Sequence, residues 1–449
     1  MFRKGGAQKN MISVKNVHEI LKRSILADGF DIVLDFEKSQ GSYLYDAKHD
    51  KRYLDLFSFF ASLPLGFNHP RFKDKDYVEK LLRVSMVKPS NADIYTIEYA
   101  DFVETFHRLA IRDLFQHLFF IGGGALAVEN ALKTAFDWKV RKNFARGMKE
   151  EVGHQIIHFK QAFHGRSGYT LSMTNTFDPN KTKYFPKFNW PRITNPKCFF
   201  PLEGENLKRT LEAEKTALEE IHQAISRHGP DIAALTIEPI QGEGGDNHFR
   251  PEFFQALRRI CDENEILLIF DEVQSGMGLT GKWWAFEHYG VRPDIIAYGK
   301  KSQVCGIAAT TRIDDVDNVF KVPSRINSTF GGNLTDMVRC AQYCRIIEEE
   351  RLLDHVAKMG TWFKEELLGL AKIHPQMTNV RGLGLMIAFD LPDSATRDAF
   401  RDACYDDGLL ILACGERTIR LRPCLNITRE DLTKALDILS TNITVKGRN

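Results

Sequence analysis

The sequence predicts an α/β protein, with a large domain built on a mostly parallel sheet flanked by helices and a smaller α+β domain after it. Short apolar runs bounded by Gly, Pro or acidic residues are typical of strands buried on both faces. These runs alternate with helical segments, which is the pattern of parallel sheets. After about residue 335 helical periodicity dominates and only short strands follow, which indicates the second domain.

The length of the chain, 449 residues, is enough for two or three compact units. We expect an N-terminal segment at residues 1–65 that joins the small domain, a large domain at 66–330, and the small domain at 331–449. No internal repeat or Pro-rich linker separates these parts, so we expect them to pack closely.

The large domain contains three runs that predict buried strands: DIAALTIEP at 231–239, ILLIFDE at 266–272 and DIIAYGK at 294–300. Helices are predicted for AVENALKTAFDWKVRKNFARG at 127–147 and PEFFQALRRICDENE at 251–265. The second begins with Pro, which is favoured at the first helical position because its missing N–H would have no partner there.

The small domain begins with a long helical pattern at 337–372. Short strands are predicted after it, at MIAFDL (386–391), LLILACG (409–415) and TIRLRP (418–423). Helices and short strands in this order are typical of an α+β unit.

The charges nearly balance, with 61 Lys plus Arg against 59 Asp plus Glu, so a nucleic-acid-binding role is not indicated. The N-terminus lacks an apolar signal region and no apolar run is long enough to span a membrane, so we expect a cytoplasmic protein. The eight cysteines are scattered. The one close pair, Cys340 and Cys344, has no second pair of ligands nearby, so we expect buried free thiols and no metal site.

Three predicted strands each end in a chemically useful side chain: Glu238, Asp271 and Lys300. Ligands of open α/β sheets bind at the carboxyl ends of strands, so the three groups should share one site. A single strand-end Asp is more often a helix cap, and a Lys pair is more often solvated. Together, however, an amine and a carboxylate are what pyridoxal phosphate requires, one for the Schiff base and one for the pyridine nitrogen.

A run of three glycines, 122–124, lies between the apolar run HLFFI and the helix predicted at 127–147. Glycine lets backbone N–H groups approach an anion, and a helix N-terminus adds its positive dipole. The spacing matches neither a P-loop nor a dinucleotide fingerprint. The run therefore indicates either a phosphate site or a tight turn before a helix.

The fragments LLIFDEVQSGMGLTG, PDIIAYGK and NSTFGGN resemble the subgroup III, or ω-, aminotransferases of PLP fold type I. The resemblance extends from the strand near Tyr53 to the C-terminal RLRP, which is most of the chain. Within this group the chain is most similar to members that use the ε-amino group of L-lysine. The similarity lies in FFIGGGALAVENALKTAFDWK, FHGRSGYTLSMTNT, FPKFNWPRI, IQGEGGDNHFRPEFF and GKKSQVCG.

The resemblance implies that Lys300 is the catalytic amine and that Asp271 pairs with the pyridine nitrogen of pyridoxal 5'-phosphate. Adjacent side chains of an extended segment leave on opposite faces, so we expect Lys301 to point elsewhere, as a structural or surface lysine. The other implied cofactor contacts are Gly124 and Ala125 at the phosphate, Phe163 stacked on the ring, Gln274 near the phenolic oxygen, and Thr329 at the phosphate of the partner subunit. The last contact implies a homodimer with shared active sites.

The resemblance also implies how two different substrates bind in turn. Arg166 would bind the distal carboxylate through a bidentate pair, and Asn327 would help to position the substrate. Glu243 would mask Arg422 while the amine donor is bound and would release it for 2-oxoglutarate. An ordinary buried ion pair is the alternative for Glu243 and Arg422, and the two interpretations are compatible.

The implied reaction is a ping-pong transfer of the ε-amino group of L-lysine to 2-oxoglutarate. The products would be L-glutamate and 2-aminoadipate 6-semialdehyde, which cyclises to piperideine-6-carboxylate. An ornithine or 4-aminobutyrate aminotransferase stays open, because one methylene changes discrimination only modestly. An aminomutase of the same fold and a non-catalytic PLP-binding protein stay open as well.

Overall fold

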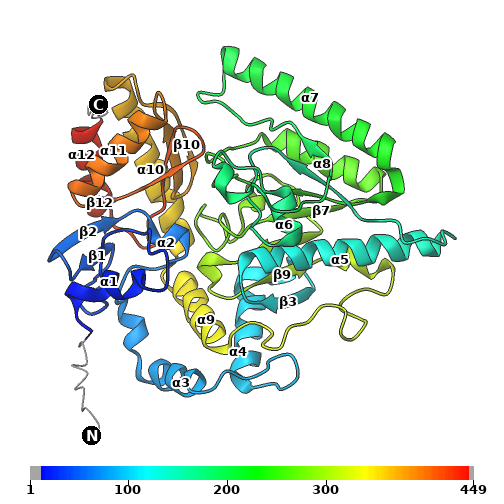
Figure 1. Cartoon of the computed structure of the whole chain (residues 1–449), viewed down its shortest axis with the longest axis horizontal. Coiled ribbons are helices and arrows are strands. Elements are labelled where there is room, and N and C mark those ends of the chain that lie inside the picture. Colours follow the sequence, from blue (N-terminus) through cyan, green and yellow to red (C-terminus); the bar gives the residue numbers. More distant parts are fainter. Residues whose placement is uncertain (1–11, 444–449) are drawn as a thin grey trace, which may run out of the picture.

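The computed structural model describes residues 12–443, and its largest sheet has seven strands in the order β3-β9-β8-β7-β6-β4-β5. All neighbouring pairs from β8 to β5 are parallel, and only β9 runs antiparallel to its two neighbours. The predicted mostly parallel sheet is therefore confirmed (Figure 1). Its strands are β3 (His117–Ile121), β4 (Gln155–Phe159), β5 (Arg192–Ile193), β6 (Ile232–Ile237), β7 (Leu267–Asp271), β8 (Ile295–Tyr298) and β9 (Cys305–Ala309).

Strand β7 shows why an uninterrupted apolar run predicts a central strand. Leu267 and Ile269 belong to the apolar cluster formed with helix α5 (Gly124–Ala145), on one face of the sheet. Leu268 and Phe270 point to the opposite face, where the Phe270 ring packs at 5.2 Å from the Phe254 ring of α8 (Pro251–Glu263). Successive side chains of a strand leave on opposite faces, so a strand between two helical layers must be apolar throughout.

Two smaller sheets lie beside the seven-stranded sheet, a four-stranded antiparallel one in the order β10-β11-β14-β13 and a three-stranded one in the order β1-β2-β12. Because β12 pairs in parallel with β2, the N-terminal part of the chain lies against the C-terminal part (Figure 1). Residues 1–11 of the predicted N-terminal segment and residues 444–449 of the predicted small domain lie outside the described residues. The strands are β1 (Tyr43–Asp46), β2 (Lys51–Asp55), β10 (Thr378–Leu383), β11 (Met386–Asp390), β12 (Leu409–Leu410), β13 (Leu412–Cys414) and β14 (Thr418–Leu421).

The helical pattern predicted at 337–372 forms two helices, α9 (Leu334–Glu349) and α10 (Leu352–Ile373). Arg351 separates them with a left-handed backbone, φ +50°. Within residues 12–443 no helix is long and apolar enough to cross a membrane. The remaining longer helices are α1 (Val17–Lys22), α3 (Lys75–Ser85), α4 (Ile97–Phe106), α6 (Gly168–Met173), α7 (Gly204–His228), α11 (Ser394–Asp406) and α12 (Arg429–Asn442).

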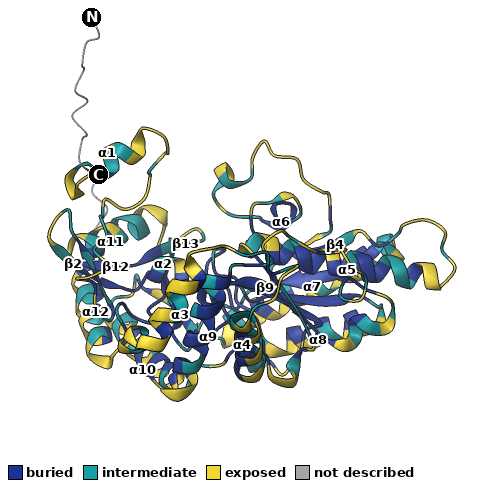
Figure 2. Cartoon of the chain, turned by 90° about the horizontal axis from the view of Figure 1, so that it is seen from below, coloured by how far each residue is buried: buried dark blue, intermediate teal, exposed yellow. Residues whose placement is uncertain are grey.

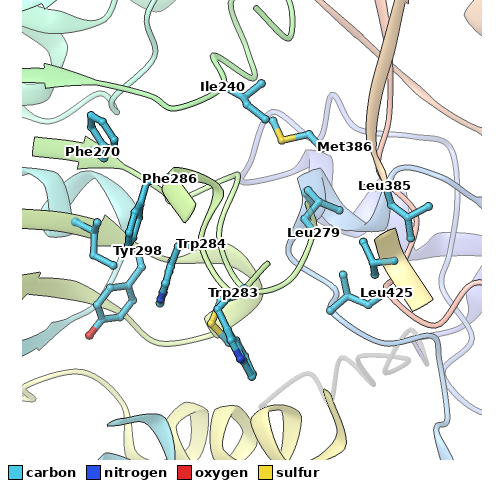
Figure 3. Packing of buried hydrophobic residues seen from close by; sticks show 14 of the residues in the cluster. Ile240, Phe270, Leu279, Trp283, Trp284, Phe286, Tyr298, Leu385, Met386 and Leu425 are labelled. Atoms are coloured by element: carbon cyan, nitrogen blue, oxygen red, sulfur yellow. The ribbon is translucent and has the colours of Figure 1, made fainter. Parts of the chain in front are cut away.

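One continuous apolar core joins the large sheet to the four-stranded sheet. Ile240 and Phe270 on the side of the large sheet belong to the same buried cluster as Leu385 and Met386 on the other side, with Leu279 between them (Figure 3). The strands of the large sheet are buried, while several helices show an exposed outer face (Figure 2). The parts of the chain therefore pack closely.

The short segment α2 (Ser58–Ala61) is a left-handed turn and not a regular helix. Its four residues have φ between +41° and +66°, although none of them is glycine. Such a conformation costs free energy at each residue and persists only where the surroundings impose it. The surrounding contacts come from the turn that follows β8.

Candidate active site

A cavity of about 310 Å³ opens at the carboxyl ends of β7 and β8, within the size range of small-molecule sites. Most of the predicted site residues line it. They are Gly124, Ala125, Phe163, Arg166, Asp271, Gln274 and Lys300. A larger cavity of about 970 Å³ lies between residues 198–202 and 377–383 and does not contain Asp271 or Lys300. We assign the site to the smaller cavity because it combines the amine with the carboxylate.

Lys300 begins the short turn Lys300–Ser302 that directly follows β8. Its backbone is left-handed, with φ +52°, which is unusual for a residue with a side chain and is typical of functional sites. Burial lowers the pKa of the Lys300 amine despite the attraction of Asp271. No residue in the described range 12–443 forms a hydrogen bond with Lys300 Nζ. The amine is therefore held in the cavity without a fixed partner.

Asp271 ends β7, and both of its carboxylate oxygens are fixed. The Val273 backbone N–H donates to Oδ1 at 3.0 Å, and His164 Nδ1 donates to Oδ2 at 2.8 Å. Burial acts to lower the pKa of His164, but the hydrogen bond and charge of Asp271 outweigh it, so the pKa is raised. A protonated His164 places a positive charge against the Asp271 side chain. His164 was not among the residues predicted from the sequence, although it follows Phe163 in the FHGRS motif.

Glu238, the third strand-end group, also lines the cavity. It accepts hydrogen bonds from the backbone N–H groups of Phe163, at 2.9 Å, and Gly242, at 3.2 Å. Burial raises the pKa of its carboxyl above the usual range. Glu238 thus holds the loop that contains Phe163 against the loop that contains Gly242.

The glycine run forms the turn between β3 and α5, as the sequence suggested. Gly123 has φ +105°, a conformation that favours glycine, and α5 starts at Gly124. A Cβ atom on Gly124 would lie 2.9 Å from Val273 Cγ1, so a side chain there would press on the neighbouring loop. The N-terminus of this 22-residue helix therefore faces the cavity with free backbone N–H groups and a positive dipole.

Phe163 and Arg166 form one wall of the cavity. The Arg166 guanidinium lies 5.9 Å from the centroid of the Phe163 ring, in cation–π geometry. Arg166 is exposed and Phe163 is half-buried. The wall therefore offers a flat ring toward the interior and a cation toward the entrance.

The predicted pair of Glu243 and Arg422 is not formed in this structure, because each side chain has a different partner. Glu243 forms an ion pair with Lys181, from the connection between α6 and β5. Arg422 is 1% exposed and forms an ion pair with Asp246. It also donates a hydrogen bond to the Leu421 carbonyl at 2.9 Å. Arg422 is thus engaged in holding the loop at 241–247.

A second arginine, Arg420, lies closer to the chemistry than the sequence suggested. Its Nη1 is 3.4 Å from Gln274 Oε1, and Arg422 Nη2 is 3.3 Å from the same oxygen. Unlike Arg422, Arg420 forms no ion pair with a carboxylate of the described residues. Its positive charge contributes to the lowered pKa of Lys300, after the larger effect of burial. Arg420 lies in β14, and Arg422 is the first residue after that strand. Because they are two residues apart in an extended segment, their side chains face the same side, and the sequence alone does not distinguish them.

Asn327 and Thr329 lie outside the cavity. Both are exposed, in the segment that leads to α9. Phe330 in the same segment accepts a backbone hydrogen bond from Asn91 at 3.3 Å. Within one subunit, these two residues do not reach the cavity lined by Lys300.

Lys301 is 1% exposed, so the surface interpretation of this lysine is wrong and the structural one is correct. Its Nζ donates a hydrogen bond to the Ala61 carbonyl at 2.9 Å, which fixes the left-handed turn α2. Burial lowers the pKa of Lys301 to about 7. Burial also raises the pKa of the nearby Asp55 carboxyl to about 6.

The groups around the cavity fit pyridoxal phosphate. Lys300 supplies an unpaired amine, Asp271 a fixed carboxylate, the α5 N-terminus an anion-binding turn, and Phe163 an aromatic wall. Gln274 adds a carboxamide on the same cavity. No two of these groups come from the same strand or helix, so the site depends on the whole sheet being formed.

Comparison with known proteins gives a consistent result. The family model described as aminotransferase class-III matches residues 26–443. The L-lysine-epsilon aminotransferase of Mycobacterium tuberculosis is 50% identical over 423 residues, which is 94% of this chain and 93% of that protein. The mitochondrial 4-aminobutyrate aminotransferase of Mus musculus is 32% identical over 420 residues, covering 89% and 82% of the two chains.

A solved structure gives the same picture in three dimensions. The lysine aminotransferase from M. tuberculosis in the internal aldimine form superposes with a TM-score of 0.94 and 48% identity, over 96% of this chain and 99% of that chain. From the family match, the similarity over nearly the full length and the groups that meet in the cavity, we conclude that the chain belongs to the class-III aminotransferases, which are pyridoxal-phosphate enzymes.

Proposed function

We propose that this enzyme transfers the ε-amino group of L-lysine to 2-oxoglutarate in a ping-pong reaction, giving L-glutamate and 2-aminoadipate 6-semialdehyde. The strongest support is the sequence identity, which is 50% with a lysine aminotransferase but only 32% with a 4-aminobutyrate aminotransferase. The semialdehyde product cyclises to piperideine-6-carboxylate, because its aldehyde and its α-amine are in the same molecule.

The cofactor and the chain have separate tasks. When bound, pyridoxal phosphate supplies an aldehyde that takes up the amino group and a protonated ring that withdraws electrons from the substrate carbon. Asp271, fixed by Val273 and His164, stabilises the proton on the ring nitrogen. Gly124, Ala125, Phe163 and Gln274 line the cavity. Gly124 and Ala125 would bind the phosphate through the start of α5, Phe163 would stack on the ring, and Gln274 would contact the ring oxygen.

Lys300 acts as the base that moves a proton from the ε-carbon of the donor. An amine must be neutral to accept a proton, and burial favours the neutral form of Lys300 by lowering its pKa. The missing hydrogen-bond partner leaves its nitrogen free to move between positions in the cavity. The strained backbone at φ +52° directs the side chain into that space.

Two arginines bind the carboxylates of the substrates, each at a different position in the site. Arg166, at the entrance, binds the α-carboxylate of L-lysine and the distal carboxylate of 2-oxoglutarate. Arg420, which forms no ion pair with a carboxylate of the described residues, receives the carboxylate next to the ketone of 2-oxoglutarate. Glu243 neutralises that arginine while L-lysine is bound. Arg420 replaces Arg422 in this role because Arg422 is engaged with Asp246.

The enzyme acts as a homodimer, and Thr329 and Asn327 complete the site of the partner subunit. Both are exposed, next to a group of exposed apolar residues that one subunit leaves uncovered. Contiguous apolar surface of this kind is typical of subunit interfaces. The exposed apolar residues nearby are Met86, Val87, Ile94, Tyr95, Ile97 and Phe330.

The eight cysteines are all unpaired and buried. Free thiols in this number are typical of a reducing compartment, so we place the enzyme in the cytoplasm.

The test of the proposed reaction is a donor comparison with the purified holoenzyme and 2-oxoglutarate. We expect L-lysine to give glutamate together with a cyclised product that o-aminobenzaldehyde detects, at a kcat/KM well above those of L-ornithine and 4-aminobutyrate. A higher kcat/KM with either of these donors would overturn the assignment. Turnover of L-lysine without 2-oxoglutarate would indicate an aminomutase instead.

A further inference from the structure

The ion pair between Lys181 and Glu243 links two segments that are distant in sequence. Lys181 lies in the connection from α6 to β5, and Glu243 in the loop that follows β6. Both side chains are mostly covered, with relative exposures of 24% and 19%. Lys181 contacts Glu243 through Oε1, while Oε2 is buried without a partner. Half of the Glu243 carboxylate therefore has room for a second cation.

Contacts link the loop of Glu243 to such a cation, Arg420. Gly242, the neighbour of Glu243, packs against Gln274, since a Cβ on Gly242 would lie 2.4 Å from the Gln274 carboxamide. The same carboxamide accepts hydrogen bonds from Arg420 Nη1 at 3.4 Å and from Arg422 Nη2 at 3.3 Å. Glu243 is thus one residue away from a chain of contacts that reaches both arginines, of which Arg422 is already paired with Asp246.

We propose that Lys181 is a positioning residue that holds Glu243 away from Arg420 and so keeps the site ready for 2-oxoglutarate. This inference rests on the proposed function, in which Arg420 binds the carboxylate next to the ketone. Glu243 has one negative charge, which Lys181 holds in this structure and which Arg420 would take up in the proposed function. While Lys181 holds it, the guanidinium of Arg420 is free for a substrate carboxylate.

The expected size of the effect follows from the partial exposure of the pair. Ion pairs at partly exposed positions change an equilibrium by up to about fivefold. Without Lys181, Glu243 would pair with Arg420 for a larger fraction of the time. A dicarboxylate would then compete with Glu243, and its apparent affinity would fall by the fraction of free Arg420.

The direct test is binding of glutarate to the holoenzyme, measured by calorimetry. Glutarate has both carboxylates of 2-oxoglutarate but no ketone, so it binds without reacting. We expect Lys181→Gln to raise the glutarate Kd about fivefold, and to raise the 2-oxoglutarate KM by a similar factor. The half-reaction with L-lysine should keep its rate, and Lys181→Arg should restore the glutarate affinity.

The matched control is Lys183→Gln, because Lys183 is in the same connection but contacts the Tyr184 ring and no described carboxylate. We expect this variant to bind glutarate as the wild type does. An equal loss for both lysines would mean a general loss of positive potential and would overturn the proposal.

The decisive experiment combines Lys181→Gln with Glu243→Gln. If Lys181 acts through Glu243, its replacement has no effect on the glutarate Kd once Glu243 is neutral. The same fivefold loss in the Glu243→Gln background would show that Lys181 contacts the ligand itself, which contradicts the proposal. A wild-type enzyme that fails to transaminate L-lysine with 2-oxoglutarate would instead refute the proposed function, whatever the lysine variants show.

Discussion

Lys300 and Lys301 are neighbours in sequence, yet their amines lie in different surroundings. The Lys300 amine faces the cavity, whereas the Lys301 amine is bonded to the Ala61 carbonyl in the interior. The sequence shows two identical side chains, and only the left-handed backbone of Lys300 separates their directions. Lys300 is therefore best tested by its effect on the reaction rate, and Lys301 by its effect on the free energy of unfolding.

Replacing Lys301 by Met, a side chain of similar length, should change how stability depends on pH. The pKa of Lys301 falls from its ordinary value of 10.5 to about 7 in the folded protein because of burial. Between these pH values the unfolded chain binds more protons, so the wild type gains stability as the pH rises. We expect this gain between pH 7 and pH 9 to exceed that of Lys301→Met by as much as ~2 kcal/mol.

Urea unfolding of both proteins at the two pH values measures this difference. Groups that do not interact with Lys301 contribute equally to both proteins and cancel in the comparison. Asp55 does not cancel, because the charge of Lys301 lowers its pKa. Identical pH dependence of the wild type and the variant would mean that the Lys301 amine stays charged when buried.

Asp271→Asn should leave the cofactor bound but slow the chemistry. A neutral carboxamide no longer stabilises the proton on the ring nitrogen, so we expect the single-turnover half-reaction with L-lysine to slow by at least about a hundredfold. Cofactor content, measured after denaturation, should stay at one per subunit. A rate near that of the wild type would reduce Asp271 to a structural role.

Single residues also show where sequence reasoning ends. Asp271 and Lys300 could be identified because they follow apolar strands, and strand ends meet at one edge of a sheet. His164 was missed because its partner is 107 residues away, and no local pattern marks that contact. Arg422 was predicted and Arg420 was not, because both have the same residue type and face the same side, so no sequence pattern favours Arg420 over Arg422.

At the scale of elements, the strands were the most predictable part. β6, β7 and β8 follow the predicted apolar runs, because burial on both faces leaves no room for polar residues. The division between α9 and α10 was missed, because Arg351 adopts a left-handed backbone without a Gly or Pro to indicate it.

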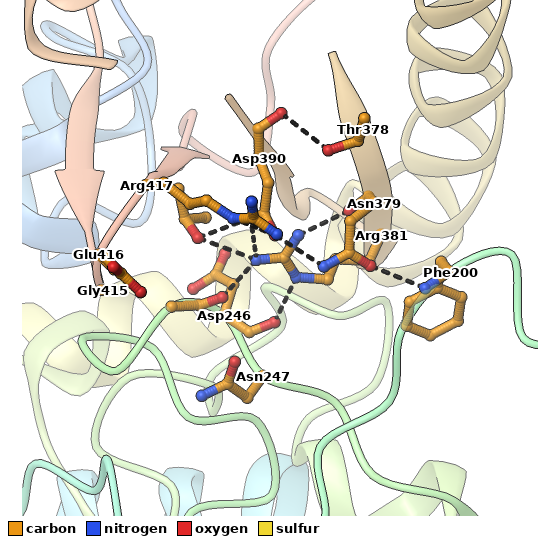
Figure 4. A network of polar contacts seen from close by, with 12 residues as sticks. Phe200, Asp246, Asn247, Thr378, Asn379, Arg381, Asp390, Gly415, Glu416 and Arg417 are labelled. Carbon is orange, nitrogen blue, oxygen red and sulfur yellow. Dashed lines mark hydrogen bonds and ion pairs between the residues drawn. The ribbon is translucent and has the colours of Figure 1, made fainter. Parts of the chain in front are cut away.

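The loop at 241–247 is bonded to the four-stranded sheet through Arg381. Its Nε donates to the Asp246 carbonyl at 2.9 Å, and its Nη2 donates to Asp390 at 2.9 Å (Figure 4). Both Arg381 and Asp390 are buried. Arg417 approaches the same Asp390 at 3.9 Å but is half-exposed. Two arginines thus contact the same carboxylate, one of them buried and the other half-exposed.

We expect Arg381→Met to lower the free energy of unfolding by about 3–5 kcal/mol, because it leaves Asp390 buried without its main partner. Arg417→Met should lower it by less than about 1 kcal/mol, since exposed ion pairs contribute little. Denaturant unfolding of the two variants measures both values. Equal losses would show that burial does not decide the strength of these contacts.

At the scale of the whole molecule, hybrid dimers test whether the active site is shared. Lys300→Ala and Thr329→Ala subunits are each expected to be poorly active alone. In a hybrid, one site combines both defects, while the other combines an intact Lys300 with an intact Thr329. We therefore expect co-refolded or co-expressed hybrids, separated by two affinity tags, to regain about half of the wild-type activity per dimer.

Hybrids no more active than the Thr329→Ala dimer would place Thr329 in the same subunit as Lys300. Sedimentation of the wild type provides the control for the assembly itself. A monomer in solution would contradict the shared site directly.

The loop at 241–247 follows β6 of the large sheet, but its hydrogen bonds and ion pairs connect it to residues of the four-stranded sheet and its connections. Gly415 donates to the Glu243 carbonyl at 2.8 Å, and Arg381 and Arg422 both bind Asp246. The two halves of the protein therefore cannot change their relative angle without displacing the backbone of Glu243. In the proposed function Glu243 selects between an amine donor and a keto acid, so a change in that angle would act on the residue that makes the selection. We therefore expect that a substitution far from the cofactor can alter substrate preference by changing that angle.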